Sequence, residues 1–94
     1  MTDQERELFE RALYHFGPAI QSKKLLEEMA ELQVEILHYG LGRSNLDKIA
    51  EEIADVGIML DQMILLFQCG GAVQQVRAEK VDRLRHMIFR EEND

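Results

Sequence analysis

The fold of this chain is decided by residues 45–68, which read NLDKIAEEIADVGIMLDQMILLFQ. Apolar residues recur there every three or four positions, as they do along one face of an α-helix. This apolar stripe consists of Ile49, Ile53, Val56, Leu60, Met63 and Phe67. Ser44 or Asn45 can cap the start of the helix, and we expect the helix to end near Gln68.

Helix signals flank this central segment on both sides. Thr2 followed by Glu5 is typical of a capping box, which begins a helix. A Gly-Pro pair at 17–18 separates that helix from the next, and a Gly-Gly pair at 70–71 is expected to end the central helix. The three further helices are predicted at residues 2–16, 18–39 and 72–90. No segment alternates as a strand would, so the predicted class is all-α.

The central helix carries more apolar surface than one stripe needs. Ile58 and Leu65 lie well away from the stripe, and Leu66 lies beside it. A helix that is apolar on several sides is central in its bundle or contacts another subunit. In so short a chain, contact with a second copy is the natural explanation. We therefore predict a single domain over residues 1–94, a four-helix bundle completed by homo-oligomerisation.

Composition excludes several classes of protein. The 94 residues are 46% hydrophobic and 31% charged with a single Pro, which indicates one globular domain. The net charge of -7 disfavours binding of nucleic-acid polymers, although a nucleotide remains possible where metal ions offset the charge. Cys69 is the one cysteine, so no internal disulfide can form and a reducing compartment is expected.

The sequence also indicates where the protein is found. The acidic N-terminal residues do not resemble a signal peptide. The longest apolar run, residues 64–67, is far too short to cross a bilayer. We therefore predict a cytoplasmic protein with no membrane partner.

A short acidic pattern occurs twice, as EEMAEL at 27–32 and as EEIADV at 51–56. In a helix each copy places two acids about 60° apart on one face, at the edge of an apolar stripe. In the first copy that stripe consists of Leu25, Met29, Leu32 and Ile36. Packed antiparallel about a local two-fold axis, the two helices would bring four acids together. These acids are Glu28, Glu31, Glu52 and Asp55.

Such a group of acids suits a hard divalent cation. Two carboxylates about 5 Å apart repel by roughly 3 kcal/mol at an effective dielectric constant of about 20. A bound cation reverses the sign of that interaction, and carboxylate oxygens favour Mg²⁺, Mn²⁺ or Ca²⁺. Di-iron bundles are a competing metal site, but they need Glu-x-x-His pairs, which neither copy has. The alternative without a metal is a solvated face of helix-forming Glu residues.

The two acidic motifs resemble those of a known family. EExxE at 27–31, followed after 20 residues by ExxD at 52–55, resembles the signature of the MazG-like all-α nucleoside triphosphate pyrophosphohydrolases. The resemblance extends over QSKKLLEEMAEL at 21–32, NLDKIAEEIADVGIML at 45–60 and KxxRL at 80–84. It therefore covers about two-thirds of the chain and is closest to the short phage and bacterial members.

The resemblance implies a reaction, a cofactor and an assembly. Similar proteins use Mg²⁺ to cleave a nucleoside triphosphate between the α and β phosphates, and Mn²⁺ is a possible substitute. They form homodimers or dimers of dimers with a four-helix core shared between subunits. The metal ligands carried over by motif are Glu28, Glu31, Glu52 and Asp55. Glu27 would hold a second metal or orient the attacking water, whereas Glu51 is expected to be solvated.

Several side chains are candidates for contact with the substrate. Lys80 and Arg83 share one face of the fourth helix, where they would meet the β and γ phosphates or form only an exposed ion-pair face. Lys24 would contact phosphate or merely pair with Glu28 one turn later. Gln21 lies on nearly the same face and would contact a base or sugar, unless it is a solvated amide.

Three functions are consistent with these motifs. The leading hypothesis is hydrolysis of nucleoside triphosphates for control of the nucleotide pool. The absence of Trp and the presence of only two Tyr residues disfavour selection of one base by stacking, so a broad substrate set is expected. The alternatives are an enzyme like phosphoribosyl-ATP pyrophosphohydrolase and a helical module that binds nucleotide or protein without catalysis.

Overall fold

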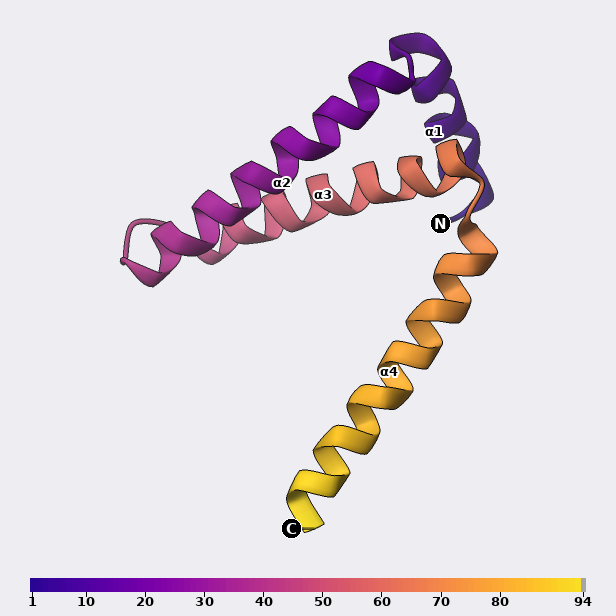
Figure 1. Ribbon diagram of the computed structural model, residues 1–94. Coiled ribbons are helices and arrows are strands. Elements are labelled where there is room, and N and C mark those ends of the chain that lie inside the picture. Colours follow the sequence, from indigo (N-terminus) through magenta and orange to yellow (C-terminus); the bar gives the residue numbers. More distant parts are fainter. Residues whose placement is uncertain (94) are drawn as a thin grey trace.

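The computed structural model describes the backbone of residues 1–93 and the side chains of residues 1–90. It contains four helices, and no strand occurs over residues 1–93 (Figure 1). The predicted all-α class is therefore confirmed. The helices are α1 (Asp3–Phe16), α2 (Pro18–Gly40), α3 (Leu46–Phe67) and α4 (Gly70–Asn93).

The first three helices begin where their capping residues predict. Thr2 and Glu5 form the complete capping box, with the Thr2 N–H donating to Glu5 Oε1 at 2.7 Å and the Glu5 N–H donating to Thr2 Oγ1 at 3.1 Å. Gly17 precedes α2 with φ 92° and ψ 151°, a backbone region that essentially only glycine occupies. Asn45 caps α3, because its Oδ1 accepts the Lys48 N–H at 2.9 Å.

The junction between α3 and α4 differs from the sequence prediction. The Gly-Gly pair at 70–71 was expected to end α3, but α3 ends at Phe67 and Gly70 already begins α4. Gln68 takes the left-handed conformation that ends α3, with φ 51°, and its N–H bonds back to carbonyls of the last turn. The predicted fourth helix is correct in position, but it is longer than the 72–90 expected.

α2 and α3 form an antiparallel hairpin, to which α1 and α4 are attached. α2 and α3 lie side by side along most of their length, and α1 packs against both near the end that joins α3 to α4 (Figure 1). α4 contacts α3 only where the two helices join and then runs away from the hairpin (Figure 1). Among the described side chains, only three apolar ones are buried, namely Phe9, Met59 and Met63.

The chain on its own is more open than a compact monomer. It exposes 7734 Å² of surface, whereas a compact protein of this size exposes about 5,600 Å². Its radius of gyration is 16.7 Å, against about 12 Å for a compact domain of 94 residues. None of the helices in the described part of the chain is long and apolar enough to cross a membrane.

The apolar stripe predicted on α3 is only partly covered within one chain, since Met63 is buried and Ile49 and Val56 are half-buried. Four residues spaced seven apart along α3 remain between 46% and 67% exposed. They are Leu46, Ile53, Leu60 and Phe67. The side chains that α3 buries are Met59, Gln62 and Met63. Within one chain, Ile53, Leu60 and Phe67 of the predicted stripe therefore remain exposed.

Candidate metal centre

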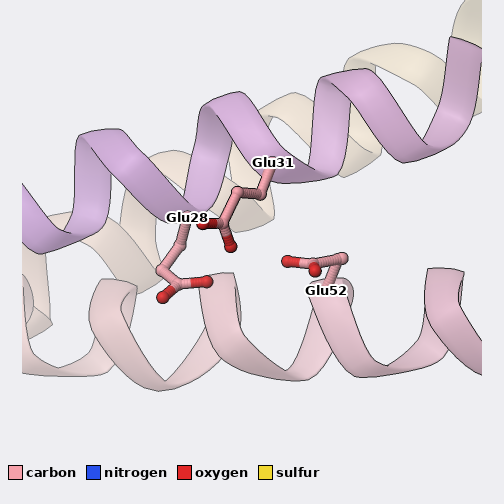
Figure 2. A group of neighbouring side chains, drawn as sticks. All are labelled: Glu28, Glu31 and Glu52. Carbon is pink, nitrogen blue, oxygen red and sulfur yellow. The ribbon is translucent and has the colours of Figure 1, made fainter.

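Three acidic side chains from the two hairpin helices converge. Glu28 and Glu31 extend from α2 towards α3, and Glu52 extends from α3 towards them (Figure 2). One carboxylate oxygen from each lies within 4.8 Å of the others. The spacing of Glu28 and Glu31 puts both on one face of α2, and the antiparallel packing of α3 brings Glu52 opposite them. We call these three residues the acidic cluster.

Two oxygens of the acidic cluster are buried without a partner. Glu28 is only 6% exposed, and Glu52 is half-buried. The Oε2 atoms of both residues are inaccessible to solvent and have no hydrogen-bond partner. A buried carboxylate oxygen without a partner is costly, and a bound cation removes that cost. Since every donor is a carboxylate oxygen, the cluster fits Mg²⁺ or Mn²⁺ better than a softer metal.

Asp55, the fourth predicted ligand, lies beside the acidic cluster. It is half-buried on α3, one turn after Glu52. It is not one of the three acids whose oxygens lie within 4.8 Å, but its negative charge raises the pKa of both Glu31 and Glu52. The sequence therefore predicted the neighbourhood of all four acids, and the structure brings three of them into the closest group.

The charges of the cluster raise two of its pKa values. The negative charge of Glu28 is the main cause that raises the pKa of Glu31, and burial adds to it. Burial is the main cause that raises the pKa of Glu52, followed by the charges of Glu31 and Asp55. On the other side of the cluster, a hydrogen bond to Glu28 raises the pKa of Lys24, which therefore remains a cation.

These shifts predict how the stability of the metal-free protein depends on pH. The folded chain holds protons on Glu31 and Glu52 more tightly than the ordinary pKa of 4.5 would allow. Their stabilising contribution is therefore complete below that value and is lost as pH rises through the raised pKa values. We expect the Tm measured in EDTA to rise as pH falls from neutral towards 4.5.

Two matched double variants distinguish an effect of the acidic cluster on the Tm from an effect of net charge. Glu31→Gln with Glu52→Gln removes the two shifted groups, so the Tm should no longer rise as pH falls. Glu27→Gln with Glu51→Gln removes the same charge from neighbouring exposed positions, and the rise should persist. Equal flattening in both double variants would attribute the effect to net charge and contradict the assignment.

Gln21 is placed in the interior, beside a residue that the sequence analysis missed. Its Nε2 donates to Gln62 Oε1 at 2.7 Å, and both side chains are buried between α2 and α3. A signal for Gln62 was present, because it lies seven residues after Asp55 and therefore on nearly the same face of α3. In this chain the Gln21 amide links the two helices, and its contact with a substrate stays a prediction.

The other predicted site residues are exposed. Glu27 lies on the solvent side of α2 next to Glu28. Lys24 forms an ion pair with Glu28, with Nζ 3.1 Å from Oε1. This pair is the alternative to phosphate contact that the sequence left open. Lys80 and Arg83 lie on α4, which does not contact α2, so a single chain does not bring them to the acidic cluster. Among residues 1–90, neither of these two forms a salt bridge.

Comparisons with known proteins do not assign the chain to a family. No protein-family model matches the chain, and neither a curated protein nor a solved structure matches it significantly.

Proposed function

We propose that this chain is a Mg²⁺-dependent hydrolase of nucleoside triphosphates, which adds water across the bond between the α and β phosphates. The products are a nucleoside monophosphate and pyrophosphate. The observation that carries the proposal is the acidic cluster, in which Glu28 and Glu52 each hold a buried oxygen without a partner. The resemblance of both acidic motifs to those of the MazG-like enzymes supports the reaction class.

The proposed cation is held by Glu28, Glu31 and Glu52. Asp55 lies one turn after Glu52 on α3, and its negative charge acts on the pKa of Glu52. When bound, Mg²⁺ supplies a charge that polarises a phosphoryl oxygen and lowers the pKa of a water molecule. Few protein ligands are enough, because Mg²⁺ keeps several waters and takes further oxygens from substrate phosphates. The acidic cluster needs that positive charge before it can accept a triphosphate, since its three carboxylates alone would repel the substrate.

Glu27 is the proposed catalytic carboxylate. It lies on the exposed side of α2 directly beside the buried Glu28. An exposed carboxylate at this position can accept a proton from the attacking water, or it can hold a second cation. In either role it acts on the solvent side of the acidic cluster, where a substrate would enter.

Self-association is part of the proposal, since one chain does not bring basic side chains of α4 to the acidic cluster. The chain exposes about 2,100 Å² more than a compact monomer of its size, an area typical of each subunit in an obligate dimer. Charge supports the same arrangement. Residues 70–93 contain five basic and four acidic residues, whereas residues 18–67 contain four basic and nine acidic. We propose that α4 of one copy delivers Lys80 and Arg83 to the triphosphate held by another.

The test is an assay of the purified protein with a panel of ribonucleoside and deoxyribonucleoside triphosphates. Each reaction is run with Mg²⁺, with Mn²⁺ and with EDTA, and pyrophosphate and monophosphate are quantified. Equimolar release of both products that requires the cation supports the proposal. Release of inorganic phosphate in place of pyrophosphate contradicts it. Turnover of phosphoribosyl-ATP alone, or of no triphosphate, would favour one of the two alternatives instead.

A further inference from the structure

One basic side chain already touches the acidic cluster. Lys24 lies on α2 one turn before Glu28, and its Nζ lies 3.1 Å from Glu28 Oε1. The Lys24 side chain is 52% exposed, whereas the Glu28 side chain is 9% exposed. The pair therefore joins a half-exposed cation to a buried anion, and the ammonium approaches from the solvent side.

The two oxygens of Glu28 have different surroundings. Oε1 has the Lys24 ammonium as its partner, but Oε2 is inaccessible and has no partner. Among residues 1–90, no other salt bridge involves the acidic cluster. Lys24 is thus the only positive charge among residues 1–90 that forms an ion pair with a member of the acidic cluster, namely Glu28.

We propose that Lys24 is the resident counter-ion of the empty acidic cluster and that a divalent cation competes with its charge. The proposal rests on the cation site proposed above and adds a residue that regulates it. In the metal-free protein, Lys24 offsets the repulsion among Glu28, Glu31 and Glu52. Once a divalent cation binds, the same ammonium is a like charge beside it, so Lys24 weakens binding of the metal. Lys24 thereby stabilises the empty site at the expense of metal affinity.

The test compares Lys24→Met with wild-type protein. Met keeps most of the apolar stem and removes only the charge. We expect the dissociation constant for Mn²⁺, measured by calorimetry without nucleotide, to fall about three- to tenfold. We also expect the Tm in EDTA to fall, while the Tm in saturating Mn²⁺ stays close to the wild-type value. Both differences should shrink in about 0.5 M salt, because the pair is half-exposed.

Two control variants make the result specific to the charge at this position. Lys23→Met removes the same charge from an exposed neighbour that makes no salt bridge among residues 1–90, and it should leave Mn²⁺ binding unchanged. Lys24→Arg retains the charge and should bind Mn²⁺ as wild type does. A Lys24→Met protein that binds Mn²⁺ as wild type does overturns the inference. Weaker binding by Lys24→Met also overturns it, since Lys24 would then position Glu28 for the metal.

The outcome for wild-type protein separates this inference from the function on which it rests. Wild-type protein that binds no Mn²⁺ removes the cation site, and the proposed function fails with it. Wild-type protein that binds Mn²⁺ with an affinity independent of Lys24 leaves the proposed function intact, and only the role of Lys24 is lost.

Discussion

The Glu52→Gln variant is expected to lose at least about 100-fold of the proposed Mg²⁺-dependent hydrolysis, while its metal-free form becomes more stable to heat than wild type. The loss of activity follows because the neutral amide is a weaker ligand than the carboxylate and does not offset the charge of the cation. The gain in stability follows because Glu52 is half-buried, its pKa is raised, and its Oε2 has no partner. Turnover of a deoxynucleoside triphosphate and the Tm in EDTA are the two measurements.

The opposite directions of these two effects distinguish a functional acid from a structural one. Glu51→Gln is the matched control, since it removes the same charge from the preceding, exposed position of α3. It should keep nearly full activity, and its Tm should change little. A Glu52→Gln protein that loses stability as well as activity would indicate that Glu52 holds the fold together. Retained activity would remove Glu52 from the proposed site.

The sequence predicted the helices and the acidic cluster because both depend on local periodicity. The start of α1 depends on Thr2 and Glu5, three positions apart, and Asn45 similarly caps α3. The convergence of the acids needed one further assumption, that α2 and α3 pack antiparallel. A loop of five residues between them leaves little other choice, and Figure 1 bears that assumption out.

Some of the features that the sequence did not predict are local, and others depend on contacts between distant residues. The end of α3 is one case, because Gln68 takes the left-handed conformation that the Gly-Gly pair two residues later was expected to provide. The partner of Gln21 is another, since a buried amide can bond to any amide brought opposite it. The packing of α4 is a third feature, because its apolar and basic residues do not indicate whether α4 packs against its own chain or against another copy.

The exposed apolar residues of α3 indicate which surface of the hairpin a second copy would cover. On α3, the exposed residues Ile53 and Leu60 lie about 80–100° around the helix axis from Glu52. On α2, the exposed residues Met29 and Ile36 lie at the same angles from Glu28. If a local two-fold axis relates α2 to α3, these two apolar stripes lie on the same side of the hairpin. Such a side, apolar on both helices, is what a second hairpin would cover to complete a four-helix core.

Replacing one residue of this stripe tests that arrangement. We expect Leu60→Glu to weaken self-association at least about 100-fold, because each of two symmetric copies loses about 2 kcal/mol of apolar burial and gains a charge. Sedimentation equilibrium measures the change. Tyr14→Glu is the control, since Tyr14 is 94% exposed on α1, outside the stripe, and the variant should assemble as wild type does. A Leu60→Glu protein that also assembles normally would contradict the proposed interface.

Activity provides the stricter test, because the proposed site combines acids from one copy with basic residues from another. Glu52→Gln and the double variant Lys80→Ala with Arg83→Ala should each be inactive alone. When they are mixed and allowed to exchange subunits, half of the dimers contain one intact site, so activity should return to about a quarter of wild type. Introducing Leu60→Glu into both partners should abolish that recovery. If α4 instead folded back onto its own hairpin, mixing would restore nothing, because no chain in the mixture would carry both halves of a site.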